Sequence, residues 1–82
     1  MKQIQAGTPI TVGDLKLIPL ERLLMHCDNS KKVFFIYMTK EPIGVVIISH
    51  HGRSAIDING EPVPLETYLQ QINNLQEVIN SL

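Results

Sequence analysis

The stretch from Lys32 to His50 constrains this chain more than any other. It holds two apolar runs, Val33–Met38 and Ile43–Ile48, on either side of Thr39-Lys40-Glu41-Pro42. β-Branched and aromatic residues dominate both runs, and such residues favour strands over helix. A proline with charged neighbours is typical of a turn, so the sequence predicts a β-hairpin here.

Placing Met38 opposite Ile43 divides this hairpin into two faces, because successive strand residues point to opposite sides. The first face holds Phe34, Ile36, Met38, Ile43, Val45 and Ile47. The second face holds Val33, Phe35, Tyr37, Val46 and Ile48, with Gly44 opposite Tyr37, and an aromatic ring over a strand glycine is stabilising. Antiparallel sheets commonly keep one solvated face. Neither face is polar here, so the rest of the chain or a second copy must cover both.

Composition indicates one globular domain, residues 1–82, with 44% hydrophobic and 18% charged residues. The net charge is −1 and the longest basic run is Lys31-Lys32, so we expect no nucleic-acid partner. No apolar run reaches the length of a signal peptide or a membrane span, so we expect no membrane partner. The single cysteine, Cys27, cannot form an intramolecular disulfide, which indicates a reduced, cytoplasmic protein.

Along the chain, residues 1–31 are predicted to form an N-terminal hairpin and a connector. Ile10 and Val12 alternate with Thr11, and Leu15 and Leu17 with Lys16, around a Gly13-Asp14 turn. Residues 19–27 fit either helix or strand, and we favour a helical turn near Pro19–Arg22 followed by a strand. Residues 32–58 then form a three-stranded meander, in which a turn at His51-Gly52 pairs His50 with Arg53 and sets Ile56 beside Ile47.

Residues 64–82 are predicted to form one helix, roughly Leu65–Ser81, started by Pro64 and by Glu66 in its first turn. Its apolar stripe consists of Leu65, Tyr68, Leu69, Ile72, Leu75, Ile79 and Leu82. We expect this helix to cover the first face. If the N-terminal hairpin joins the sheet at an edge, the second face stays bare and marks an interface, with the helix stripe as the alternative surface. The candidate interface residues are Phe35, Tyr37, Val46, Ile48, Leu69 and Ile72.

Residues that could carry chemistry are few. Met25-His26-Cys27-Asp28 and His50-His51 are the clusters of potential metal ligands, but neighbouring strand residues point to opposite faces, so we expect no metal and no cofactor. Cys27 with His26 or His50 could form a nucleophile and base, yet few polar groups remain to build a pocket around them. Asp57 falls on the second face, where it is open to water or paired with Lys16, Arg22 or Arg53.

One resemblance rests on Gly7-Thr8-Pro9-Ile10, Gly13-Asp14, Leu17-Ile18-Pro19-Leu20 and Arg22, and on Glu41-Pro42-Ile43-Gly44-Val45-Val46. These segments resemble the G-x-P-I, I-I-P-x-x-R and proline-led strand motifs of the GerW/YtfJ-like sporulation protein family. The resemblance covers less than half of the chain, and Leu23–Met38 stands where that family is rich in glycine. It implies a β-rich assembly protein and transfers no catalytic residue.

These observations predict an α+β fold: a mainly antiparallel sheet of about five strands with one C-terminal helix packed on a face. The function they favour is a non-catalytic module for self-association, as a homodimer, or for binding another protein. The alternative is a small-molecule or metal-binding protein that uses His26, Cys27, His50 and His51.

Overall fold

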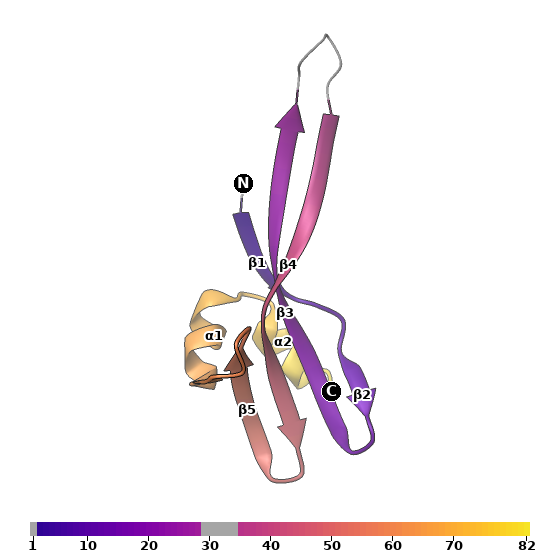
Figure 1. Ribbon diagram of the computed structural model, residues 1–82. Coiled ribbons are helices and arrows are strands. Elements are labelled where there is room, and N and C mark those ends of the chain that lie inside the picture. The colour runs from indigo at the N-terminus through magenta and orange to yellow at the C-terminus, as the bar shows by residue number, and fades with distance from the viewer. Residues whose placement is uncertain (1, 29–34) are drawn as a thin grey trace.

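The computed structural model describes residues 2–28 and 35–82 and shows an α+β fold, as predicted (Figure 1). A six-stranded antiparallel sheet has the order β1-β3-β4-β5-β6, and β2 pairs with β3. The strands are β1 (Lys2–Ala6), β2 (Ile10–Val12), β3 (Leu15–Asp28), β4 (Phe35–Ser49), β5 (Gly52–Asp57) and β6 (Pro62–Val63). Two short helices follow, α1 (Leu65–Gln71) and α2 (Leu75–Asn80).

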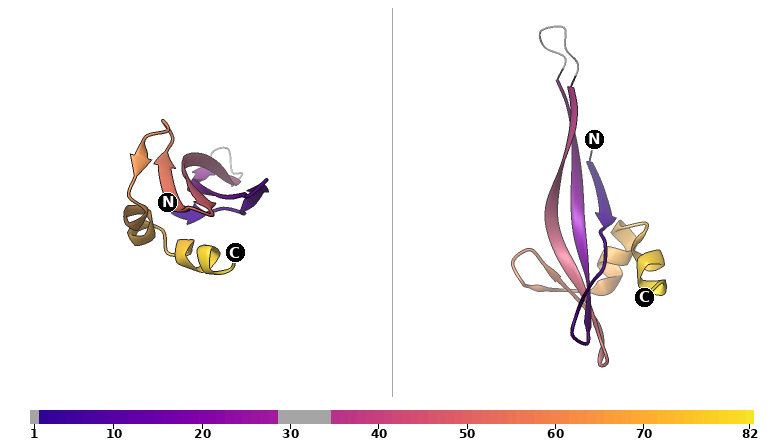
Figure 2. Two further views of the ribbon diagram at one scale, coloured as in Figure 1. Left: turned by 90° about the horizontal axis from the view of Figure 1, so that it is seen from below. Right: turned by 90° about the vertical axis from the view of Figure 1, so that its right-hand side faces the viewer.

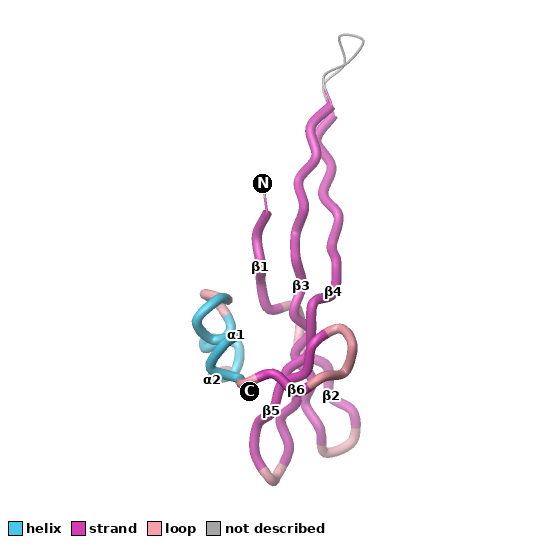
Figure 3. Tube along the Cα trace, turned by 60° about the vertical axis from the view of Figure 1, so that its left-hand side comes forward, coloured by secondary structure: helices cyan, strands magenta, loops and turns pink. Residues whose placement is uncertain are grey.

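The long strands β3 and β4 give the molecule an elongated shape of 55 × 22 × 21 Å. The first part of β3, Leu15–Leu20, and the last part of β4, Gly44–Ser49, lie together with β2, β5, β6 and both helices. We call this part of the molecule the body. The other parts of β3 and β4, Glu21–Asp28 and Phe35–Pro42, form a two-stranded arm that extends away from the body (Figure 1). Strand β1 runs beside the base of this arm (Figure 3).

The predicted hairpin across Thr39–Pro42 is wrong, because β4 passes straight through this segment. Met38 pairs with Met25 of β3. The register shifts between Leu20 and Glu21 of β3 at a β-bulge, and Ile43 of β4 is the extra residue that has no partner on β3. Pro42 is tolerated because its backbone points away from β3, toward the β5 side of β4. The pairing of β5 with β4 ends at Gly44, so no described strand there needs an N–H from residue 42. The predicted strand positions Val33 and Phe34 lie outside the described residues.

The predicted helical turn near Pro19 is also wrong, since Pro19 lies inside β3, whereas the predicted strand up to Cys27 is confirmed. The carbonyl of Pro19 accepts a hydrogen bond from the Gly7 N–H at 2.8 Å, so its backbone faces the side of β1 and β2. Residues 7–9 connect those two strands and leave a gap in the ladder there. The missing N–H of proline therefore removes at most one hydrogen bond, at the point where β1 has ended.

Both helices pack on one face of the sheet, which we call the covered face (Figure 2). It is the second face of the sequence prediction, so the expectation that the helix covers the first face is wrong. Val46 and Ala55 on this face are buried beneath the helices. The complete core consists of Ala6, Ile18, Leu20, Val46, Ala55, Tyr68, Ile72, Leu75 and Ile79.

The predicted single helix is broken into two, although it begins after Pro64 as expected. Ile72 leaves the helical conformation, with φ −117° and ψ 106°, and α2 begins only at Leu75. The break places the side chain of Asn74 against the end of β1. The Ala6 N–H donates to Asn74 Oδ1 at 2.9 Å, and Asn74 Nδ2 donates to the Ala6 carbonyl at 3.2 Å. Bending the chain lets Ile72, Leu75 and Ile79 all reach the core.

The two short hairpins match the sequence in part. The Gly13-Asp14 turn is confirmed, with Ile10 opposite Leu17 and φ +58° at Gly13. The next turn lies one residue earlier than predicted, at His50-His51, and Ser49 pairs with Gly52. Ile56 therefore lies beside Val45 rather than Ile47. The faces are unchanged, because the register differs by two residues.

Candidate interaction surface

The six interface candidates from the sequence are scattered by the structure. Val46 and Ile72 are 0% and 1% exposed, inside the core of this chain, and so are not surface residues. Ile48 and Leu69 are half-buried and pack against that core. The backbones of Phe35 and Tyr37 lie in the arm, and their side chains are not among those described.

In the described part of the chain, no element covers the opposite face of the body, which we call the open face. Two rows of side chains cross the strands and form this face. The first row is Ile10, Leu17 and Ile47 on β2, β3 and β4. The second row is Pro19, Val45 and Ile56 on β3, β4 and β5. Val12 and Leu15 extend it next to the Gly13-Asp14 turn. Ile10 and Val12 are 53% and 54% exposed, and the remaining members are partly exposed. The open face consists of Ile10, Val12, Leu15, Leu17, Pro19, Val45, Ile47 and Ile56.

Charge is missing from this face. The other strand residues that point to the same side of the body are Ser49, Gly52, Ser54 and Pro62, none of which is ionisable. The charged strand residues of the body, Lys16, Arg53 and Asp57, lie on the covered side instead. An uncharged, apolar sheet face of this kind is typical of a surface that another molecule covers.

The amount of accessible surface is also high for a chain of this size. The structure exposes 5971 Å², whereas a compact monomer of 9.2 kDa exposes about 4,900 Å². Its radius of gyration is 15.4 Å, compared with about 12 Å for a compact domain of this length. The elongated shape contributes to this excess of about 1,000 Å².

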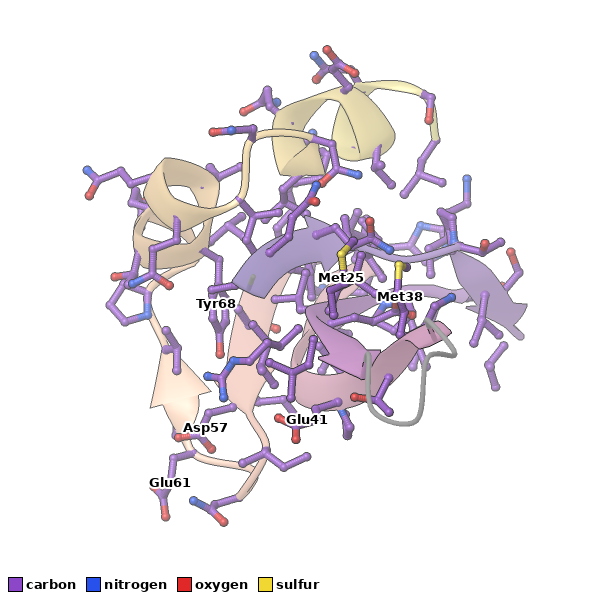
Figure 4. All side chains as sticks on the ribbon, turned by 90° about the horizontal axis from the view of Figure 1, so that it is seen from above. Met25, Met38, Glu41, Asp57, Glu61 and Tyr68 are labelled. Atoms are coloured by element: carbon purple, nitrogen blue, oxygen red, sulfur yellow. The ribbon has the colours of Figure 1, made fainter. Side chains whose placement is uncertain are left out.

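The arm carries both apolar and charged side chains. Met25 and Met38 face each other across its two strands (Figure 4), and with Gln3 and Leu23 they line a cavity of about 50 Å³. Among the described residues, two ion pairs lie at the base of the arm. Arg22 Nη1 is 3.6 Å from Glu41 Oε2, and Lys40 Nζ is 3.9 Å from Glu21 Oε2. These ion pairs are partly solvated, so each adds well under about 1 kcal/mol.

The potential metal ligands are divided between the two ends of the molecule. His26 and Cys27 lie in the arm opposite Tyr37 and Ile36, whereas His50 and His51 form the turn after β4. Tyr37 and His50 are 13 residues apart along one strand, roughly 40 Å. One ion therefore cannot use both pairs, and Cys27 cannot use His50 as a base. Among the residues described, no three His, Cys, Asp or Glu side chains form a group suited to a metal ion.

Asp57 has a structural partner that the sequence did not predict. Its Oδ1 accepts hydrogen bonds from the Asn59 N–H at 2.9 Å and the Glu61 N–H at 3.0 Å. The carboxylate thereby holds the turn between β5 and β6, where Asp57 and Glu61 lie near one another (Figure 4). None of the predicted cationic partners, Lys16, Arg22 or Arg53, pairs with it in the described part of the chain.

A shallow hollow of about 240 Å³ lies between the two turns of the body and the end of α2. Lys16, His50 and Arg53 stand around it with Asp14, and Ile48 and Ile79 contribute apolar wall. Of these polar residues, Asp14, His50 and Arg53 are exposed and Lys16 is partly exposed. The hollow is therefore open to solvent rather than enclosed.

Sequence reasoning missed the open face, although one signal for it was present. The alternation around Gly13-Asp14 already placed Ile10, Val12, Leu15 and Leu17 on one side. The missing information was that β3 continues into the sheet and aligns this row with Val45 and Ile47.

Neither helix within residues 2–28 and 35–82 has the length and apolar content needed to cross a bilayer. Comparison with protein families, with curated proteins and with solved structures finds no match to this chain.

Proposed function

We propose that this protein is a non-catalytic self-association module, in which the open face is buried against the open face of a second copy. The observation that carries the proposal is a row of apolar side chains across three strands, with both helices on the opposite side of the sheet. The resemblance to a family of β-rich assembly proteins stays a prediction that agrees with this role.

Two physical arguments favour a second copy as the occupant. An uncharged surface is compatible with itself, because it brings no like charges together when a two-fold axis superimposes one patch on its equivalent. Two sheets that pack face to face lie about 10 Å apart and bury alternate side chains of each strand. The open face offers such side chains on β2, β3, β4 and β5.

The direct test is the molar mass in solution, measured by light scattering or sedimentation at micromolar concentration. Ile10→Glu is the informative variant, because Ile10 is already half-exposed in the single chain and a glutamate there leaves the core intact. We expect this variant to have a lower mass than the unmodified protein. Gln70→Glu, an equal charge change on the exposed side of α1, is the matched control and should keep the original mass.

Ile47→Glu, at the centre of the open face, should lower the mass in the same way, with circular dichroism to confirm folding. The proposal would be contradicted if the unmodified protein stayed monomeric at a concentration of about 100 micromolar, or if both variants kept its mass.

A further inference from the structure

Within residues 2–28 and 35–82, no strand pairs with the outer backbone edge of the arm segment of β4. The hydrogen bond from the Gly7 N–H to the Pro19 carbonyl shows that odd-numbered residues of β3 face the β1 side. Even-numbered residues therefore face β4, and their partners Glu41, Thr39 and Tyr37 face β3 in return. The backbone groups of Lys40, Met38 and Ile36 consequently point away from β3. Strand β5 does not reach them, since its pairing with β4 ends at Gly44.

The edge of β1 near the body is occupied, in contrast. There the side-chain amide of Asn74 bonds both the N–H and the carbonyl of Ala6, as a neighbouring strand would. On the other side of the body, β6 pairs with β5. In the described part of the chain, the arm segment of β4 is thus a long stretch of edge with no such cover.

The outer part of the arm also lacks the cover that a ribbon needs. Among the described residues, β1 pairs with β3 only as far as Leu24, so Met25–Asp28 and Phe35–Met38 form a ribbon of two strands there. Two-stranded ribbons are marginally stable in water, and a third strand or a packed layer is usually needed. Met38, on the unpaired edge, is 55% exposed.

We propose that the arms of two copies pair edge to edge, β4 against β4, in antiparallel orientation about a two-fold axis at Met38. This register pairs Met38 with its equivalent and Lys40 with Ile36, and it uses every outward N–H and carbonyl of these three residues. It also keeps the two lysines apart. The next outward residue is Pro42, which has no N–H, so the ladder ends there.

This contact adds a second surface to the proposed function, and it rests on that proposal only for the use of the open face. Pairing of two β4 edges needs a two-fold axis perpendicular to the sheet, whereas packing of two open faces needs a two-fold axis parallel to the sheet. The same two copies cannot satisfy both. Together the two surfaces link more than two copies, as in a tetramer with two kinds of two-fold contact.

Disulfide trapping tests the register. In the background Cys27→Ser, which removes the single native thiol, Met38→Cys places two sulfurs on the axis, with Cα atoms about 5.5 Å apart. We expect it to form a covalent dimer in air. Lys40→Cys, two residues along the same edge, is the matched control. Its equivalents are separated by roughly 13 Å along the strands and should stay reduced. Equal trapping at both positions, or none at Met38, would overturn the inference.

Mass measurement separates this inference from the proposed function. Met38→Pro removes an N–H that β3 does not use, and Met38→Thr changes the side chain but keeps that N–H. We expect Met38→Pro and Ile10→Glu each to give dimers, the double variant to give monomers, and Met38→Thr to keep the full assembly. If Met38→Pro leaves the mass unchanged while Ile10→Glu gives monomers, the arm contact is wrong and the open-face contact stands. If Ile10→Glu has no effect and Met38→Pro gives monomers, the reverse holds.

Discussion

The hydroxyl end of Tyr68 on α1 lies against Gly44 of β4. A Cβ added at residue 44 would come within 2.6 Å of the Tyr68 hydroxyl oxygen and 2.5 Å of the Ile56 carbonyl oxygen. The same hydroxyl donates a hydrogen bond to that carbonyl at 3.4 Å. The sequence predicted an aromatic ring over Gly44 but assigned Tyr37. The ring instead comes from the helix, because Tyr37 pairs with His26 far along the arm.

Gly44→Ala should destabilise the protein by about 1–3 kcal/mol, the usual cost of forcing atoms into a filled core. The backbone carbonyl of Ile56 cannot move aside as a flexible side chain would. Urea denaturation followed by circular dichroism would measure the change. Tyr68→Phe relieves only the contact with the hydroxyl, so Gly44→Ala should stay destabilising in that background. A neutral effect of Gly44→Ala would show that neither the Tyr68 hydroxyl nor the Ile56 carbonyl lies so close to Gly44.

The stability of the protein should fall at high pH because of Tyr68. Burial, and secondarily the negative charge of Asp57, raises the pKa of this tyrosine above its ordinary value of 10.0. A raised folded-state pKa contributes stability that is complete below pH 10, the value in the unfolded chain, and is lost as the pH rises through the folded-state pKa.

Melting temperatures measured from pH 8 to pH 11 should therefore fall more steeply for the unmodified protein than for Tyr68→Phe. The other tyrosine, Tyr37, is present in both proteins, so its titration cancels in the comparison. Parallel pH profiles would count against a buried Tyr68.

Asn74→Ala should cost about 2 kcal/mol, because it removes two hydrogen bonds of about 1 kcal/mol each to the Ala6 backbone. Asn73→Ala, at the exposed neighbouring position, is the matched control and should change stability by less than about 0.5 kcal/mol. Asn74→Asp keeps the acceptor for the Ala6 N–H but sets a carboxylate oxygen against the Ala6 carbonyl oxygen, so it should still destabilise the protein. Amide hydrogen exchange at Ala6 should accelerate in Asn74→Ala, and protection equal to that of the unmodified protein would refute the contact.

Asp57→Ala should destabilise the turn between β5 and β6 by about 1 kcal/mol, because the Asn59 and Glu61 N–H groups lose their acceptor. Asp57→Asn keeps a side-chain oxygen in the same place and should recover most of this loss. Chemical denaturation of the three proteins would measure the difference. Equal stability of Asp57→Ala and the unmodified protein would mean that water replaces the carboxylate at no cost.

Local sequence determined several features correctly. Glycine with a positive φ at Gly13 and the alternation beside it specified the first hairpin, and Pro64 and Glu66 marked the beginning of α1. The α+β class followed from strand-forming runs and a helical stripe. Each of these depends on interactions between residues close in the chain, which a sequence displays directly.

Pro19 and Pro42 misled the prediction from sequence, and for the same physical reason. Proline is excluded from a strand only where its N–H would be needed, and that depends on which neighbour lies on that side. At Pro19 the neighbouring strand is interrupted at residues 7–9, and at Pro42 the neighbour β5 has ended. The pairing of β3 with β1, β2 and β4 is long-range, so no local pattern contains it.

By itself, then, the sequence determined that this chain has more apolar strand surface than one helical segment can cover. Only the tertiary structure decided which face stays uncovered. Tyr68 fits over Gly44, a strand position without a side chain, and Asn74, between the two helices, bonds the backbone of Ala6. Both contacts lie on the side of Val46, and together they hold the helices there, so that the row containing Leu17 and Ile47 is left exposed.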